Sequence, residues 1–453
     1  MKNLLFALLL LPFSIHAQWN TVGSAGFSSG AAYFTSIAIS GSGTPYVVYS
    51  DYGNSQKATV MKYNGSRWLT VGSSGFSAGV ANVTSIAIDG SGTPYVVYED
   101  GANSFKATVM KYNGSSWVTV GSTGFSAGQA ITITLALDGS VTPYVAYRDA
   151  ATSNNGVTVM KYNGSSWVTV GSAGFTTGAA LYTSIAIDGG GSPYVAYVDS
   201  INSNRATVMK YNGSNWVTVG DAGFSTGATL YTSLAIDGTG TPYVAYEDNA
   251  SSSYGPVTVM KYDGSSWITL GSAGFSAGWA ILTKIAIDGS GVPNVVYEDN
   301  ISSSSGPATV MKYNGSSWVT IGSAGFSAGQ AVNPAIAFGS GIPYVVYEDF
   351  ANSQKATVME FGFPSEVKNA VNSEITSLSV FPNPNKGLFT LNISTSNNED
   401  AQIIITNILG EKVKELMMPT NKEKEVQLQT QAGIYFISAV TNNGSITTKI
   451  VVE

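Results

Sequence analysis

A segment of aromatic and β-branched residues recurs seven times along this chain, and its spacing constrains the fold more than any other feature. One copy is Pro94-Tyr-Val-Val-Tyr-Glu-Asp100, and the others begin at Pro45, Pro143, Pro193, Pro242, Pro293 and Pro343. Such a run between turn signals predicts a β-strand. The spacing of 49 to 51 residues is typical of one four-stranded propeller blade. We therefore predict an all-β chain with a seven-bladed β-propeller over residues 18–364.

Each copy contains three further strand signals around this segment. In the second copy, residues 84–89 alternate as a strand packed between neighbours would, and a Gly-rich turn joins them to the Pro-Tyr-Val-Val-Tyr strand. A third strand over 107–112, an Asn113-Gly114 turn and a fourth strand over 117–120 follow. We predict four antiparallel strands in each blade, with a β-solenoid as the alternative fold.

The strand that begins with Trp is displaced by one copy relative to the other three. Its first copy, at Trp19, precedes any complete blade, and no Trp strand follows the last repeat, which ends at Phe361. We therefore predict that Trp19 to Val22 completes the last blade and closes the ring, which leaves few exposed strand edges. The order Ile-Ala-Ile-Asp, Gly, Pro-Tyr-Val-Val-Tyr resembles the NHL-type propeller repeat. This resemblance implies that the first strand of each blade lines the central channel.

The first seventeen residues predict a secretory signal peptide. Lys2 supplies the positive charge, residues 4–11 the apolar core, and Ala17 the small residue before the cleavage point. We found no other apolar run of the length that a spanning helix needs. The mature protein is therefore expected to be soluble or surface-attached, and not membrane-spanning.

Composition excludes several classes of function. The chain contains no cysteine, and its one histidine, His16, lies within the predicted signal peptide. This excludes disulfides, Ser-His-Asp and Cys-His catalysis, and ordinary His/Cys zinc sites in the mature protein. A net charge of −7 and a pI near 4.9 argue against a nucleic-acid partner, which would require a basic surface.

After a polar linker over residues 365–377, the composition changes and alternating segments over 378–453 predict a small antiparallel β-sandwich. Four motifs occur there in order: Phe381-Pro382-Asn383-Pro384 with Gly387, Asn407-Ile-Leu-Gly410, Gly433-Ile-Tyr435-Phe436, and the terminal Lys449-Ile-Val-Val-Glu453. Together they resemble the type A C-terminal sorting domain of the type IX secretion system. The resemblance implies export by that machinery, followed by release or by attachment to lipopolysaccharide at the cell surface.

Aromatic residues distinguish the copies just before the predicted innermost strands. The topology places the loops after the Pro-Tyr-Val-Val-Tyr and Trp strands on one rim, and these are the longer loops. On that rim we single out Tyr33, Tyr182, Tyr231 and Trp279 as candidate contacts to an extracellular glycan or protein. Packing between blades explains the same residues equally well.

An acidic residue ends each Pro-Tyr-Val-Val-Tyr segment. The members are Asp51, Asp100, Asp149, Asp199, Asp248, Asp299 and Asp349, preceded by Glu99, Glu247, Glu298 and Glu348 in four copies. These carboxylates are consistent with loop caps, with a calcium site, or with the acid and base of a glycoside hydrolase or lyase. Catalysis requires one asymmetric constellation, whereas seven similar copies favour caps. We therefore predict a monomeric binding or adhesion protein without a cofactor, and a bound calcium ion is the alternative left open. A hydrolase or lyase and a structural surface repeat protein are the alternatives.

Overall fold

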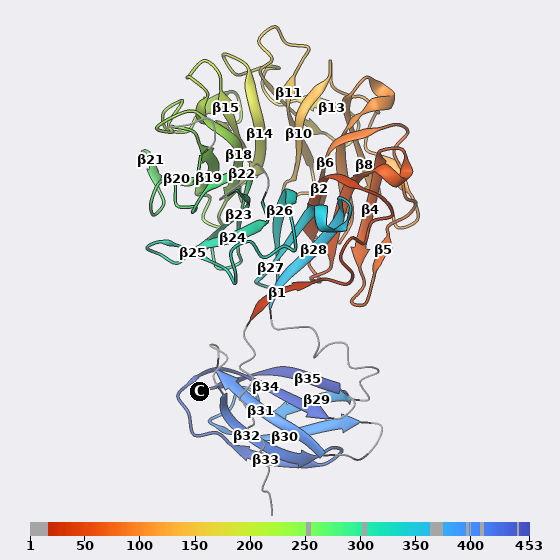
Figure 1. Ribbon diagram of the computed structural model, residues 1–453, viewed down its shortest axis with the longest axis vertical. Coiled ribbons are helices and arrows are strands. Elements are labelled where there is room, and N and C mark those ends of the chain that lie inside the picture. The colour runs from red at the N-terminus through yellow and green to blue at the C-terminus, as the bar shows by residue number, and fades with distance from the viewer. Residues whose placement is uncertain are drawn as a thin grey trace, which may run out of the picture. The chain divides into compact units, whose positions relative to one another are not determined.

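The computed structural model describes residues 17–250, 255–300, 306–362, 375–395, 398, 400–407, 412–441 and 444–453 (Figure 1). The predicted signal peptide up to His16, the linker up to residue 374, and Gly410 of the sorting motifs lie outside these residues. The chain divides into two compact units, one ending at Gly362 and the other containing the C-terminal residues to Glu453. We describe each unit by itself.

The first unit contains seven four-stranded antiparallel sheets, the blades. Blade 1 contains β2 (Ala32–Ile39), β3 (Pro45–Asp51), β4 (Lys57–Tyr63) and β5 (Trp68–Thr70). Blade 2 contains β6 (Ala81–Ile88), β7 (Pro94–Asp100), β8 (Lys106–Tyr112) and β9 (Trp117–Thr119). Blade 3 contains β10 (Ala130–Leu137), β11 (Pro143–Asp149), β12 (Val157–Tyr162) and β13 (Trp167–Thr169). In each of these blades the strands pair in the order of the chain.

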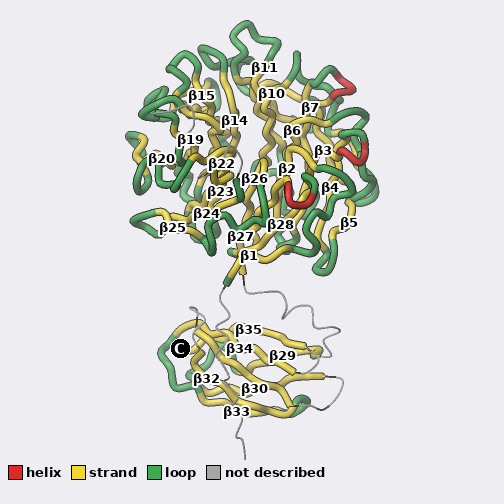
Figure 2. The backbone as a smooth tube through the Cα atoms, in the orientation of Figure 1, coloured by secondary structure: helices red, strands yellow, loops and turns green. Residues whose placement is uncertain are grey.

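The next three blades repeat this arrangement. Blade 4 contains β14 (Ala180–Ile187), β15 (Pro193–Asp199), β16 (Arg205–Tyr211) and β17 (Trp216–Thr218). Blade 5 contains β18 (Thr229–Ile236), β19 (Pro242–Asp248), β20 (Val257–Tyr262) and β21 (Trp267–Thr269). Blade 6 contains β22 (Trp279–Ile287), β23 (Pro293–Asn300), β24 (Ala308–Tyr313) and β25 (Trp318–Thr320). Three short 3-10 helices, η1 (Tyr52–Asn54), η2 (Gly101–Asn103) and η3 (Phe350–Asn352), lie in loops between strands (Figure 2).

Blade 7 joins the two ends of the propeller. Its strands are β26 (Ala331–Gly339), β27 (Ile342–Asp349) and β28 (Lys355–Gly362), and its fourth strand is β1 (Gln18–Thr21). β1 pairs antiparallel with β28 and places Trp19 opposite Phe361. The first strands of the seven blades contact one another in a closed ring, β2 with β6 and so on to β26 with β2. The predicted seven-bladed propeller and its closure by the N-terminal strand are confirmed.

A separate hydrophobic core fills each space between neighbouring blades. The second strand of each blade is buried on both faces, as expected for a strand packed between two layers. In β7, for example, Val96 packs into the core shared with blade 1, and Val97 packs into the core shared with blade 3. Because successive side chains of a strand point to opposite faces, one Pro-Tyr-Val-Val-Tyr segment stabilises two interfaces.

A Trp in each outermost strand attaches its blade to the preceding one. The ring of Trp117 stacks on Phe76 at a centroid distance of 4.1 Å, and its indole N–H donates to the Val71 carbonyl at 2.7 Å. All seven blades repeat the stack and the hydrogen bond. The seventh copy joins Trp19 to Phe326 across the ring closure. The repeated Phe residues therefore serve blade-to-blade packing.

The C-terminal unit contains two antiparallel sheets around one core. One sheet contains β29 (Ile375–Phe381), β30 (Leu388–Thr395) and β33 (Glu423–Gln427). The other contains β31 (Asp400–Asn407), β32 (Lys412–Pro419), β34 (Gly433–Thr441) and β35 (Gly444–Val452). Alternate residues of the strands, such as Leu391 and Ile403, are fully buried in the core that the two sheets share. The sandwich predicted from the alternating segments is confirmed.

The sorting motifs hold the ends of this sandwich together. Asn383 exchanges two hydrogen bonds with the last strand, donating to the Lys449 carbonyl and accepting from the Val451 N–H, each at 2.9 Å. Gly387 has a φ of +83°, and a Cβ there would lie 2.6 Å from the Leu428 carbonyl oxygen. The Tyr435 hydroxyl donates to the Gln431 carbonyl at 2.8 Å. These motif residues therefore stabilise the fold of the unit.

Candidate functional site

The two rims of the propeller differ in their connections. Tight turns join the first strand of each blade to the second and the third to the fourth, as in residues 89–93 and 113–116 of blade 2. The longer connections, from the second strand to the third and from each blade to the next, lie on the opposite rim, here called the long-loop rim. The aromatic and acidic candidates that the sequence indicated in the propeller lie on this rim.

In six blades, the aspartate that ends the second strand caps a loop on the long-loop rim by accepting a backbone N–H two residues ahead. Asp100 is fully buried and accepts hydrogen bonds from the Ala102 N–H at 3.0 Å, from Asn103 at 2.8 Å and from the Thr108 hydroxyl at 2.8 Å. The same Thr108 oxygen accepts from the Gly124 N–H at 2.8 Å. We call this arrangement the Asp–Thr network.

All seven blades contain the aspartate, the threonine and the glycine N–H of this network. Asp248, Asp299 and Asp349 accept from their threonines at 2.9, 2.8 and 2.7 Å. Across the described ranges, no group of three or more His, Cys, Asp or Glu side chains is positioned to hold a metal ion. Six of the seven aspartates therefore act as loop caps, and in blade 6 Asp299 bonds Thr309 while its Oδ1 has no partner among the described residues.

A β-bulge interrupts the first strand of every blade near the long-loop rim. One residue of each bulge has a positive φ between 45° and 57°, and the seven are Phe34, Val83, Thr132, Tyr182, Tyr231, Leu282 and Asn333. Such a backbone is uncommon for residues other than glycine. Because every blade contains it, the bulge belongs to the architecture, and only its side chain differs. The expectation that these residues precede the innermost strands is wrong: they lie inside them.

The structure brings two of the four predicted aromatic contacts together. The rings of Tyr182 in blade 4 and Tyr231 in blade 5 lie 4.6 Å apart at an angle of 52°. Trp279, the first residue of β22 in blade 6, has 47% of its surface exposed. Tyr33 lies apart in blade 1, where its hydroxyl donates to Gln354 at 2.7 Å.

The four glutamates on this rim are closed to solvent. Glu99, Glu247, Glu298 and Glu348 are between 0% and 5% exposed. Burial raises the pKa of Glu99 and of Glu247 to about 7. Glu348 accepts from the Phe34 N–H at 2.8 Å and from the Asn333 amide at 2.6 Å, and so connects blade 7 to blade 1.

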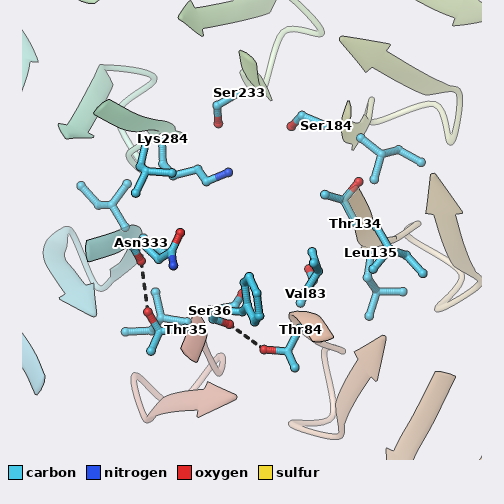
Figure 3. Close-up of a pocket in the computed structure, with 18 of the residues that line it drawn as sticks. Thr35, Ser36, Val83, Thr84, Thr134, Leu135, Ser184, Ser233, Lys284 and Asn333 are labelled. Atoms are coloured by element: carbon cyan, nitrogen blue, oxygen red, sulfur yellow. Dashed lines mark hydrogen bonds between the residues drawn. The ribbon is translucent and has the colours of Figure 1, made fainter. Parts of the chain in front are cut away.

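Next to the bulges, the first strands of the seven blades enclose a cavity of about 390 Å³ in the central channel (Figure 3). One register position of the first strand lies on the cavity wall in every blade, and in six blades it is a small residue: Ser36, Ser85, Ser184 and Ser233, with Thr134 in blade 3 and Ala335 in blade 7. Blade 6 has Lys284 at this position. Lys284 was not among the residues predicted from the sequence, although it is the one charged residue at this position of the repeat.

Residues 379–453 match the family model described as Secretion system C-terminal sorting domain. Together with the propeller that precedes it in the chain, this domain defines an exported β-propeller protein. Its C-terminal part is a type IX secretion system sorting domain, and the protein is secreted or attached to the cell surface. In the portion that the structure describes, we found no helix with the length and apolar character needed to cross a membrane.

No curated protein sequence matches the chain. Among solved structures, a mutant Aleuria aurantia lectin in complex with Fucα1-6GlcNAc is 15% identical, with a TM-score of 0.46 over 66% of this chain and 97% of the lectin. A polysaccharide lyase of family PL25, an ulvan lyase, is 12% identical, with a TM-score of 0.47 over 76% of this chain and 95% of the lyase. A Penicillium chrysogenum α-L-arabinanase complexed with arabinobiose is 11% identical, with a TM-score of 0.45 over 78% of this chain and 99% of the enzyme. Likeness at this level carries no argument about the ligand.

Proposed function

We propose that the propeller is the ligand-binding part of this exported protein, and that it binds a glycan on the long-loop rim. The observation that carries the proposal is the position of three aromatic side chains in neighbouring blades, Tyr182, Tyr231 and the exposed Trp279. Aromatic rings stack on the apolar faces of sugars, and they supply large contact areas with few rotatable bonds.

Differences between the copies support this location. A residue common to all seven blades serves the architecture, so a ligand that selects one part of the rim must recognise residues that differ. The bulge position has six residue types in seven blades, and its only tyrosines are Tyr182 and Tyr231. Trp279 replaces residues such as Ala179 and Ala228, which precede the bulge by the same number of positions in blades 4 and 5.

Binding is favoured over cleavage because of the glutamates. A glycoside hydrolase needs two carboxyl groups that reach the scissile bond from opposite sides. The four rim glutamates are buried, and the rim aspartates are engaged in the Asp–Thr network. We therefore propose a binding role, with no catalytic residue on this rim.

The test is a glycan-binding screen with the full chain, followed by affinity and melting-temperature measurements on Trp279→Ala and Tyr231→Ala. Each substitution should weaken binding by about 1 to 3 kcal/mol, as for anchor residues at other interfaces. Phe350→Ala is the matched control, because Phe350 is 42% exposed on the same rim in blade 7. If the substitutions lower the melting temperature by several degrees and leave affinity unchanged, the rings are packing residues and the proposal is wrong. Failure to retain any glycan would also contradict it.

A further inference from the structure

The central channel contains a cationic group with an uncommon environment. Lys284 lies on β22, at the register position that serine occupies in four other blades. Figure 3 shows its amine extending into the space between the strands. Among the described residues that line this cavity, no other side chain is charged and none is a carboxylate.

Lys284 has no ion pair with any residue that the structure describes. Its side chain is exposed to the cavity, but protein surrounds the channel on all sides, and this desolvation lowers the pKa of the amine. The cost of holding a cation in such a place is offset when an anion binds beside it.

Hydroxyl groups on the neighbouring strands are arranged as donors. Ser233 Oγ accepts from the Ile285 N–H at 3.2 Å, and Ser184 Oγ accepts from the Leu234 N–H at 3.1 Å. Because a backbone N–H occupies each oxygen, the hydroxyl proton is left to donate. We found no acceptor for either proton within the described ranges, and both side chains face the cavity in Figure 3.

A third hydroxyl in the same ring is unused. Thr134 Oγ1 on β10 is buried and has no hydrogen-bond partner among the described residues. A buried polar atom without a partner is uncommon in a folded protein and requires an explanation, such as a ligand or a water. A cavity with a lone ammonium group, several hydroxyl donors and no carboxylate has the chemistry of an anion site.

We propose that this channel binds a small oxyanion, a carboxylate or a sulfate, between Lys284 and the hydroxyl groups of Ser184 and Ser233. The cavity of about 390 Å³ is within the size range of small-molecule sites. It is lined by the bulge residues Phe34, Val83, Leu282 and Asn333, so it lies in the half of the channel nearer the long-loop rim. The oxyanion is either free in solution or carried on a sugar, as in a uronic acid or a sulfate ester.

The test is calorimetric titration of the full chain with sodium sulfate, sodium glucuronate and glucose, at constant ionic strength set with chloride. We expect one or both anions to bind and glucose not to bind in the channel. Lys284→Ser introduces the residue that four other blades have, and Lys284→Met keeps the side-chain length without the charge. Both should weaken anion binding at least tenfold. The control is Lys312→Ser, an exposed lysine on β24 of the same blade, which should change affinity less than twofold.

The comparison between probes distinguishes the sources. Equal affinity for sulfate and glucuronate supports a free oxyanion, and much tighter binding of glucuronate supports an acidic group carried on a sugar. Absence of binding by both anions, or undiminished binding by both Lys284 variants, overturns the proposal, as does an equal loss in Lys312→Ser. Trp279→Ala should retain anion binding, so this site and the proposed glycan surface succeed or fail separately.

Discussion

The outer strands and loops of each blade repeat strictly in their residues, whereas the bulge and the channel-facing residues of its first strand do not. The Trp–Phe stack and the Asp–Thr network occur in all seven blades with nearly the same distances. At the bulges and along the channel wall the backbone repeats, yet the side chains change from blade to blade. Residues that repeat in every blade therefore hold the ring together. Residues that vary on the repeated backbone make one side of the ring chemically different from the other.

Loss of the ring closure should destabilise the propeller more than any other change considered below. Deleting residues 18–23 removes β1 and its buried Trp19, and exposes the edge of β28. We expect a loss of about 3 to 5 kcal/mol in the free energy of unfolding, by comparison with large-to-small core changes. Denaturant unfolding and light scattering measure the loss and the aggregation that an unpaired edge promotes. An unchanged melting temperature without aggregation would contradict closure by β1.

The rim glutamates are intermediate between the repeated and the variable residues, because they occur in four of the seven blades. The pKa of Glu99 is raised from 4.5 to about 7 by burial. Between these values the folded protein binds more protons than the unfolded chain, so stability should fall as pH rises from 4.5 to 7. At about 1.4 kcal/mol per unit, the loss from this group is about 3 kcal/mol.

Glu99→Gln imitates the protonated acid, and it should reduce the loss of unfolding free energy between pH 4.5 and 7 by about 3 kcal/mol. Buried Glu247, whose pKa is also raised to about 7, keeps part of the slope. His16, the only histidine, precedes the propeller, so no histidine within the propeller titrates there. Glu425→Gln, an exposed glutamate in the C-terminal unit, is the control and should leave the slope unchanged. A slope in Glu99→Gln equal to that of the unchanged protein would show that Glu99 does not contribute to it.

Removing one Asp–Thr network should have a smaller effect. Asp100→Ala leaves the Ala102 N–H, Asn103 and Thr108 without their acceptor. Leaving buried donors unsatisfied should cost about 2 kcal/mol. Asp221→Ala, at an exposed aspartate in the connection between blades 4 and 5, should cost less than about 0.5 kcal/mol. Equal stability of the two variants would remove the distinction between cap and surface residues.

The aromatic side chains at the bulges should contribute least to stability. A double-mutant cycle changes Tyr182 and Tyr231 to alanine, singly and together, and measures the free energy of unfolding of each variant. The coupling free energy should be about 1 kcal/mol, as for other aromatic pairs. The same cycle on Tyr33 and Tyr231, in blades 1 and 5, should give none. Coupling in both pairs would indicate that the rim responds as one unit.

The sequence predicted the elements that depend on local chemistry and on repetition. Turn residues, strand alternation and the displaced Trp19 strand identified the blades and their closure. The bulge could not be predicted, because Tyr182 and Tyr231 adopt a positive φ that their residue type disfavours, and only tertiary packing imposes it. Lys284 was missed for a related reason: its importance depends on the ring that brings seven distant positions to one cavity.

The position of β28 between β1 and β27 also has a mechanical consequence. The chain leaves the propeller at Gly362, from an interior strand of blade 7, and the sorting domain follows. When tension acts along β28, two antiparallel ladders resist it in shear. An outermost strand would instead detach from its single neighbour one hydrogen bond at a time. In a surface-attached form of the protein, pairing of β28 with both β1 and β27 would oppose detachment of the last strand under load.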